Sequence, residues 1–270
     1  MFYDYHMHSS FSTDGKSTME EMVKKSIELG LEEICFTDHV DYDVYADDSF
    51  SIVYEDYFKS LETLQSKYKD KISIKKGIEF GVQTQLMDTY KKEAHQYPLD
   101  FIICSIHAID TMDLYLGNYF KDKTQYEVYE NYYLYLYNIV KNYKDYSVLG
   151  HLDLIKRYAP YDTILDDRLF SDIIEETLKQ AIYDGKGIEI NTSCYRYNLP
   201  DLTPSKYILQ MYKDLGGEII TTGSDSHHIS QVACEFDYIY SLLKNMGFKY
   251  VSKLSLIHIS EPTRQAEISY

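Results

Sequence analysis

Short apolar runs alternate along the chain with longer segments in which apolar residues recur every three or four positions. Runs of the first kind are typical of buried strands, and segments of the second kind are typical of amphipathic helices. Strands are predicted at residues 2–8, 33–37, 72–80, 100–106, 147–151, 187–191 and 218–224. Helices are predicted at residues 17–29, 55–68, 125–142, 167–183, 204–215 and 230–246, with a weaker candidate at 84–95. This alternation predicts βα units around a parallel sheet.

The number of units and the length of the chain favour a single barrel. Seven strand–helix units fall one short of the eight in the common α/β barrel, so we expect a distorted (β/α)7 TIM-like barrel of the α/β class. A chain of 270 residues fits one such domain, and no linker divides it. Two helix starts carry their own signals. Ser17-Thr18-Met19-Glu20 has the pattern of a capping box, and Pro204 suits the first position of a helix.

The alternation ends near residue 252. Residues 253–270 show neither strand alternation nor a helical stripe, and the stretch resembles a translated sequencing adapter. We therefore expect a barrel domain over residues 1–252, followed by a tail at 253–270 that is non-native or disordered. His258 lies in this tail and is excluded as a candidate ligand.

Composition and charge restrict the partners. The formal net charge is −16 and no basic block occurs, which argues against long nucleic acid as a partner. A small phosphorylated metabolite stays compatible, because bound divalent metals would reverse the local field. No apolar run approaches the roughly 20 residues of a membrane span, so no membrane partner is expected. Scattered cysteines and the lack of an apolar signal region predict a cytoplasmic protein, and the oligomeric state is left open.

Metal-ligating residue types gather at the ends of the predicted strands. His6 and His8 lie two apart on the first strand and so share one face, although such a pair alone could be incidental. The later strand ends carry His39, Glu79, His107, His151, Asp225 and His227. In a parallel barrel these side chains would converge at one mouth. Imidazole and carboxylate ligands suit Zn, Mn or Fe, so the pattern predicts a polynuclear metal site.

Residues beside these positions have weaker signals. Asp14 in an Asp-Gly pair could be an ordinary turn residue. We expect Asp38 and Asp153 to orient neighbouring ligands by accepting a ring N–H. Arg157 and Arg196 follow strand ends and are candidates for direct phosphate contact, because a guanidinium offers a fork of donors; the alternative is a surface salt bridge.

Six motifs together resemble those of the polymerase and histidinol phosphatase (PHP) superfamily, in order and spacing, over about residues 3–250. They are His6-Met7-His8, Thr37-Asp38-His39, Gly77-Ile78-Glu79, Ser105-Ile106-His107, Gly150-His151-Leu152-Asp153 and Ser224-Asp225-Ser226-His227. Any one of them would be a weak signal, whereas the set is specific for the superfamily.

This resemblance implies a PHP-fold barrel that holds three divalent metal ions, of which the sequence does not fix the identity. The first ion would be held by His6, His8, Glu79 and Asp225. Glu79 would bridge to a second ion held by His107 and His151. The third would be held by Asp14, His39 and His227, with Asp14 where some relatives use histidine.

Further phrases, such as Gly77-Ile78-Glu79-Phe80-Gly81 and His151-Leu152-Asp153-Leu154-Ile155-Lys156-Arg157-Tyr158, look like those of the monofunctional histidinol-phosphatase branch. That branch hydrolyses L-histidinol phosphate to L-histidinol and phosphate in histidine biosynthesis. Divalent metals lower the pKa of water toward about 7, which would supply a hydroxide for in-line attack on phosphorus. The alternatives are a nucleotide or oligonucleotide phosphatase or exonuclease, a protein-tyrosine phosphatase, and a non-catalytic metal-binding domain.

Overall fold

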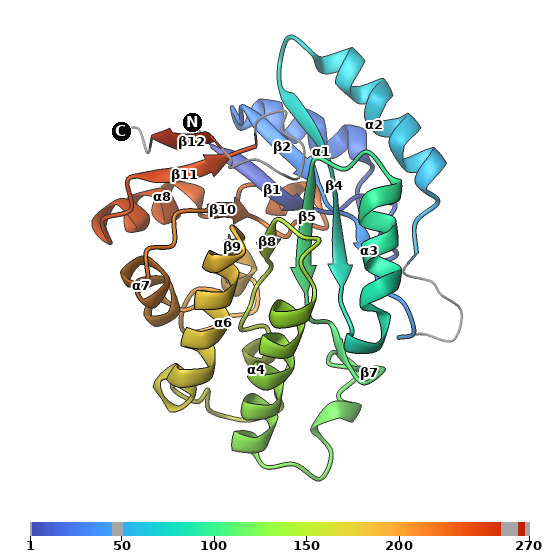
Figure 1. The fold of residues 1–270 in the computed structure, drawn as a ribbon. Coiled ribbons are helices and arrows are strands. Elements are labelled where there is room, and N and C mark those ends of the chain that lie inside the picture. The colour runs from blue at the N-terminus through green and yellow to red at the C-terminus, as the bar shows by residue number, and fades with distance from the viewer. Residues whose placement is uncertain (1, 45–50, 255–263, 268–270) are drawn as a thin grey trace.

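A parallel barrel forms the centre of the chain (Figure 1). The computed structural model describes residues 2–44, 51–254 and 264–267. Within them, seven strands follow one another in the order β1-β2-β4-β5-β8-β9-β10. Their bounds are β1 Tyr3–Met7, β2 Glu33–Phe36, β4 Ser73–Gly81, β5 Phe101–Ser105, β8 Val148–Leu149, β9 Gly187–Asn191 and β10 Ile220–Gly223. All seven predicted strands are confirmed, and β8 is shorter than expected.

The barrel closes between its last and first strands. The peptide N–H of His8 donates to the carbonyl of Ser226 at 2.8 Å, and the N–H of Asp225 donates to that of His6 at 2.7 Å. Asp4, fully buried on β1, accepts the N–H of Ser224 at 2.9 Å. The seven-stranded, distorted α/β barrel predicted from the alternation is therefore confirmed.

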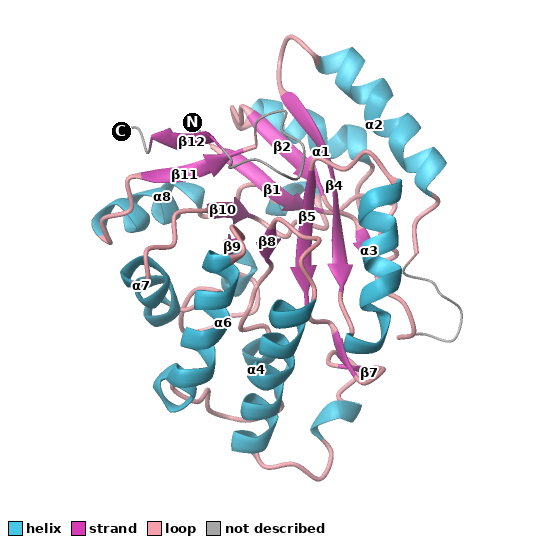
Figure 2. Ribbon diagram, in the orientation of Figure 1, coloured by secondary structure: helices cyan, strands magenta, loops and turns pink. Residues whose placement is uncertain are grey.

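Helices cover the outside of the sheet (Figure 2). They are α1 Met19–Glu28, α2 Tyr54–Tyr68, α3 Met87–Gln96, α4 Gln125–Asn142, α5 Ile155–Tyr158, α6 Ser171–Tyr183, α7 Lys206–Asp214 and α8 Phe236–Asn245. Short 3-10 turns η1 to η5 occupy Thr84–Leu86, Asn118–Phe120, Asp167–Phe170, Thr192–Tyr195 and Ile229–Gln231. No helix among the described residues has the length and apolar character needed to cross a bilayer.

Tyrosine fills much of the layer between helices and sheet. Tyr57 of α2 is fully buried and its hydroxyl donates to the carbonyl of Gly77 on β4 at 2.9 Å. Tyr90 of α3 likewise donates to the carbonyl of Gly81 at 2.6 Å. A buried tyrosine adds apolar area and needs one hydrogen-bond partner, which these carbonyls of β4 supply.

Three predicted boundaries are wrong. The capping box is one residue later than expected, because Thr18 is the N-cap of α1 and exchanges hydrogen bonds with Glu21. Pro204 precedes α7, whose N-cap is Ser205. The predicted helix at 230–246 begins only at Phe236, after the turn η5. In each case a side-chain cap or a turn sets the start, and apolar spacing does not report it.

The small strands lie outside the βα alternation. β3 (His39–Val40) pairs with β4, and β6 (Ala108–Ile109) forms a hairpin with β7 (Met112–Asp113). In the tail, β12 (Arg264–Glu267) pairs antiparallel with β11 (Tyr250–Lys253), so the described part of 253–270 has strand structure. The non-native origin of the tail stays a prediction, and His258 lies outside the described residues.

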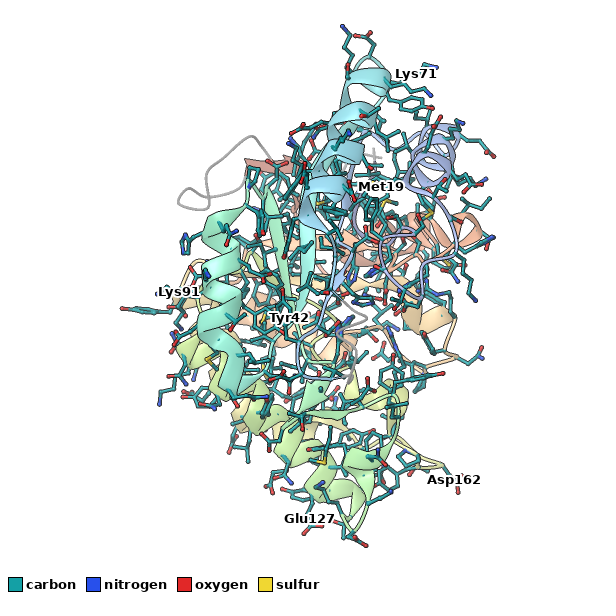
Figure 3. All side chains as sticks on the ribbon, turned by 90° about the vertical axis from the view of Figure 1, so that its right-hand side faces the viewer. Met19, Tyr42, Lys71, Lys91, Glu127 and Asp162 are labelled. Atoms are coloured by element: carbon teal, nitrogen blue, oxygen red, sulfur yellow. The ribbon has the colours of Figure 1, made fainter. Side chains whose placement is uncertain are left out.

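The parallel strands direct their carboxyl ends toward one side of the molecule. Lys71 precedes β4 and lies at one extreme of the side-chain view, whereas Glu127 and Asp162 lie at the other (Figure 3). Tyr42, just after β3, lies between them. The loops that leave the strands therefore share the side on which a barrel of this kind carries its site.

Gly223 at the end of β10 is predicted to tolerate no side chain. A Cβ there would lie 2.1 Å from Oε1 of Glu189 and 2.4 Å from Cβ of His6. We expect Gly223→Ala to lower the free energy of unfolding by about 1–3 kcal/mol through overpacking. Thermal unfolding that leaves Gly223→Ala as stable as the parent would contradict the packing described here.

Candidate metal centre

The predicted ligands come together at the carboxyl ends of the strands. His6 and His8 come from β1 and the residue after it, and Glu79 lies on β4. His39 begins β3, and the remaining members follow β5, β8 and β10: His107, His151, Asp225 and His227. Sets of three among these eight residues place their ligand atoms within 4.8 Å of one another. Asp14 joins them from the loop before α1, with Oδ2 lying 3.1 Å from Nε2 of His227.

Glu79 is the centre of the cluster, and its two oxygens face different histidines. Oε2 lies 3.0 Å from Nδ1 of His39, 3.1 Å from Nε2 of His6 and 3.4 Å from Nε2 of His8. Oε1 lies 2.9 Å from Nε2 of His151 and 3.2 Å from Nε2 of His107. One fully buried carboxylate therefore touches five imidazoles.

These spacings fit a metal site. Two nitrogen or oxygen ligands on one tetrahedral ion, each about 2.0–2.1 Å from it, lie about 3.3 Å apart. The separations around Glu79 and the 3.6 Å between Nε2 of His8 and Oδ1 of Asp225 match that value. Oε2 of Glu79 is buried and accepts no well-formed hydrogen bond from the described residues. Such an atom costs free energy unless a cation coordinates it.

A second edge of the cluster consists of two imidazole rings packed against that of His8, with His227 stacked on it and His39 tilted. The centroid of the His8 ring lies 4.1 Å from that of His227 and 4.2 Å from that of His39. Oδ2 of Asp14 faces this edge, 3.8 Å from Nε2 of His39. Asp14, which alone looked like a turn residue, therefore lies among the candidate ligands.

Two neighbouring histidines of the cluster have pKa values shifted in opposite directions. Burial, together with His227 and His39, holds the pKa of His8 well below its usual value. Burial also disfavours the charged form of His6, but the carboxylates of Glu189 and Glu79 outweigh it and raise its pKa well above the usual value. A metal ion requires the neutral imidazole, so protons and metal ions compete for this cluster.

The division of the nine residues among three ions stays a prediction. His6, His8 and Glu79 form one compact group, as expected for the first ion. However, Glu79 also groups with His39 and His107, and His8 groups with His39 and His227. The clusters overlap, and the geometry is compatible with more than one division.

The residues that orient the rings differ from those predicted. Asp38 accepts from the backbone and hydroxyl groups of Ser9 and Ser12, and the Ser12 hydroxyl lies 3.1 Å from Nδ1 of His8. Asp38 therefore acts on His8 through Ser12, and the predicted direct contact with a ring is wrong. Asp153 pairs instead with Nζ of Lys156 at 2.8 Å.

Two carboxylates outside the predicted ligand set contact ring nitrogens of the cluster directly, and neither was predicted. Oε1 of Glu189 lies 2.6 Å from Nδ1 of His6, and Oδ1 of Asp41 lies 2.8 Å from Nδ1 of His107. Glu189 is a charged residue between two isoleucines of β9, a signal that could have found it. Asp41 has no comparable signal, because it follows a two-residue strand that apolar spacing did not predict.

The two arginines have different surroundings. Nη2 of Arg157 donates to Oδ2 of Asp225 at 3.1 Å and also to the hydroxyl of Ser193, and the guanidinium lies 4.2 Å from the ring centroid of Tyr197. Arg196 donates to the carbonyls of Ser224 at 2.7 Å and Asp225 at 2.5 Å. Arg196 thus holds the loop that carries Asp225.

A cavity of about 450 Å³ lies over the cluster. Candidate ligands form its floor, and both arginines line it. Its other walls include Asp113, Tyr115, Tyr158 and Tyr197. The cavity therefore offers cationic, acidic and aromatic groups beside the metal-ligating residues.

Comparison with known protein families shows to which family the chain belongs. The model described as PHP domain matches residues 4–193, which is more than half of the 270 residues. The chain belongs to the PHP domain family. The superfamily resemblance that the six motifs indicated is thereby confirmed.

Relatives of this PHP protein include named phosphatases. The histidinol-phosphatase of Lactococcus lactis subsp. lactis is 33% identical over 264 residues, which cover 96% of each chain. That of Saccharomyces cerevisiae is 20% identical over 293 residues, 88% of this chain and 86% of the relative. The crystal structure of the Lactococcus lactis enzyme, in complex with Zn, L-histidinol and phosphate, has a TM-score of 0.87 at 32% identity and covers 94% of this chain and 97% of that one.

Less similar solved structures share the fold. The metal-dependent tyrosine phosphatases YwqE of Bacillus subtilis and CpsB of Streptococcus pneumoniae give a TM-score of 0.51 at 15% identity, covering 91% of this chain and 88% of theirs. At that identity the similarity extends to the barrel and not to the substrate.

The pKa shifts of the candidate metal ligands predict how the stability of the metal-free protein depends on pH. The raised pKa values of His6, His39 and His107 mean that the folded state binds their protons more tightly than the unfolded state. Their contribution to stability is present below the unfolded pKa of about 6.5 and is lost as pH rises through the folded values. The lowered pKa of His8 changes stability in the opposite direction, but three histidines with raised pKa values outnumber this one.

We therefore expect the metal-free protein to melt at a lower temperature at pH 8.5 than at pH 6.5. Differential scanning calorimetry in chelator measures this, with the zinc-loaded protein as the control, because bound metal removes these protons from the balance. A metal-free protein that melts higher at pH 8.5 would contradict the charge states assigned to the cluster.

Proposed function

We propose that the chain is a metal-dependent histidinol-phosphatase, which hydrolyses L-histidinol phosphate to L-histidinol and phosphate. The observation that carries the proposal is the Glu79-centred cluster of six histidines and three carboxylates beneath an open cavity. The named relatives over nearly the whole chain support the substrate. A cytoplasmic protein of histidine biosynthesis is the corresponding expectation from the sequence.

The residues that would hold divalent ions are His6, His8, Asp14, His39, Glu79, His107, His151, Asp225 and His227. Three ions are the expected number, with Zn the metal of the Lactococcus lactis complex and Mn or Fe compatible with the same donors. When bound, such ions lower the pKa of water and neutralise charge on phosphate oxygens. Asp225 links the candidate metal ligands to Arg157. Its Oδ1 faces His6 and His8, and its Oδ2 accepts from Arg157.

Arg157 is the better candidate for holding the phosphate group. Its side chain is only 7% exposed, and Asp225, Ser193 and the face of Tyr197 fix its guanidinium at the cavity wall. A guanidinium held in place loses little entropy when it binds an oxyanion. Arg196 has both terminal nitrogens on backbone carbonyls, so we assign it mainly to holding Asp225 in place.

Arg157→Ala is expected to raise KM for the phosphate ester roughly tenfold or more, because it removes a charge-assisted contact of about 1.5–3 kcal/mol. Metal content should stay parental. Arg168→Ala is the matched control, since Arg168 is an exposed arginine that pairs with the exposed Asp166 and lies over the ring of Tyr207, away from the cavity. Steady-state kinetics with unchanged KM in Arg157→Ala would remove Arg157 from the phosphate site.

The substrate is tested by comparing phosphate release from several esters. We expect kcat/KM for L-histidinol phosphate to exceed that for nucleoside monophosphates, phosphotyrosine and a generic aryl phosphate. A preference for a nucleotide or for phosphotyrosine would keep the metal site and overturn the substrate. Failure to hydrolyse any ester with metal bound would indicate a metal-binding domain without this activity.

A further inference from the structure

β9 contributes no candidate metal ligand. Residues at its carboxyl end nevertheless connect the candidate ligands with Arg157. Glu189 and Asn191 lie two apart on this strand and so point to the same face, and Ser193 follows in the turn η4. All three side chains are buried. None of the three is among the predicted site residues, and membership of the PHP domain family does not depend on them.

Both carboxylate oxygens of Glu189 have partners: His6 on β1, His151 just after β8, and Asn191 on β9 itself. Its Oε1 contacts Nδ1 of His6 at 2.6 Å. Its Oε2 accepts the backbone N–H of His151 at 3.0 Å and the side-chain amide of Asn191 at 3.2 Å. One carboxylate therefore fixes the ring of one candidate ligand and the backbone of another.

The hydrogen bonds continue from Glu189 to the phosphate side of the cavity. Oδ1 of Asn191 accepts the N–H of Ser193 at 3.0 Å and its hydroxyl at 2.5 Å. The Ser193 oxygen in turn accepts from Nη2 of Arg157. The series His6, Glu189, Asn191, Ser193 and Arg157 is thus continuous across the site.

We propose that Glu189, Asn191 and Ser193 form a positioning chain that sets the tautomer of His6 at one end and the orientation of Arg157 at the other. This inference rests on the proposed metal site. The Glu189 carboxylate can only accept at Nδ1 of His6, so the proton stays on Nδ1 and Nε2 keeps its lone pair. Nε2 is the atom that faces Glu79 at 3.1 Å and would bind the ion.

Glu189→Gln tests this assignment because glutamine cannot satisfy all the same partners. Its oxygen would stay with the two donors on Oε2, His151 and Asn191, leaving its NH2 group against Nδ1 of His6. Nδ1 would then have to accept, which moves the ring proton to Nε2 and blocks coordination there. We expect the affinity for the Zn²⁺ site at His6 to fall about 10- to 100-fold.

The measurement is competition for Zn²⁺ between the protein and a chromophoric chelator, with folding followed by circular dichroism. Glu33→Gln is the matched control: Glu33 is also buried on a barrel strand, but it accepts from Tyr5 and Ser73, away from the ligands. Its affinity for Zn²⁺ should be parental. Parental Zn²⁺ affinity in Glu189→Gln, or an equal loss in both variants, would overturn the proposal.

Ser193→Ala tests the other end of the chain and serves if Glu189→Gln does not fold. We expect parental Zn²⁺ affinity and a roughly tenfold higher Kd for inorganic phosphate, measured by isothermal titration calorimetry on the Zn²⁺-loaded protein, because Arg157 loses one of its acceptors. An unchanged Kd for phosphate would overturn the role of Ser193. These readouts use Zn²⁺ and inorganic phosphate alone, so they need no turnover of histidinol phosphate. A parent protein that binds both but hydrolyses no histidinol phosphate would refute the proposed function. The role of the positioning chain could then still be tested.

Discussion

Glu79→Gln is expected to reduce kcat/KM for L-histidinol phosphate by about a thousandfold or more. Glu79 lies against five histidines, and its two oxygens face different sides of the cluster. An amide cannot replace a bridging carboxylate, because its nitrogen is not a ligand for a hard or borderline cation. The loss corresponds to about 4 kcal/mol of transition-state stabilisation, the scale attributed to metal charge at a phosphoryl oxygen.

Metal analysis distinguishes this explanation from misfolding. We expect Glu79→Gln to retain less than the parental amount of metal per chain while its circular dichroism spectrum is unchanged. Glu33→Gln again serves as the control, because it removes a buried carboxylate on β2 outside the cluster. Near-parental activity in Glu79→Gln, with or without bound metal, would show that Glu79 does not bridge the site.

Removal of metal from the parent protein is the second change with a large expected effect. Chelation should abolish phosphate release and lower the melting temperature, because ions that bind only the folded state stabilise it. A free ion at a hundred times its dissociation constant contributes about 2.7 kcal/mol, which amounts to about 5–10 °C for a chain of this size. Buried atoms such as Oε2 of Glu79 then lose the cation that would compensate them.

Re-addition of Zn²⁺ or Mn²⁺ should restore both activity and melting temperature. Ca²⁺ is the control ion, since it prefers six to eight oxygen ligands and the cluster offers mostly imidazole nitrogen. A protein that keeps its melting temperature and activity in chelator, with metal shown to be absent, would contradict the assignment of the cluster.

The barrel was predictable because alternation and strand position carry physical information. Residues two apart on a strand point to the same face, so His6 and His8 could be placed together from the sequence. Parallel strands share a carboxyl edge, so His107 and His151 could be placed near them. The structure brings these residues together around Glu79 as expected.

The orienting residues were less predictable because they depend on the packing between strands. Glu189 on β9 contacts His6 on β1, 183 positions away in sequence, and although a charged residue on this strand is a signal, nothing near it identifies the ring that it contacts. Asp38 was assigned to a ring because of its neighbour His39, whereas the fold turns it toward Ser9 and Ser12. Sequence adjacency did not determine which side-chain atoms meet.

The most direct test of the proposed function is a titration of the metal-free protein with Zn²⁺ while phosphate release from L-histidinol phosphate is followed. We predict no release at the start, a rise as the ions bind, and a plateau when about three ions per chain are bound. Full activity before any metal is added, or a metal-loaded protein that releases no phosphate from this ester, would contradict a metal-dependent histidinol-phosphatase.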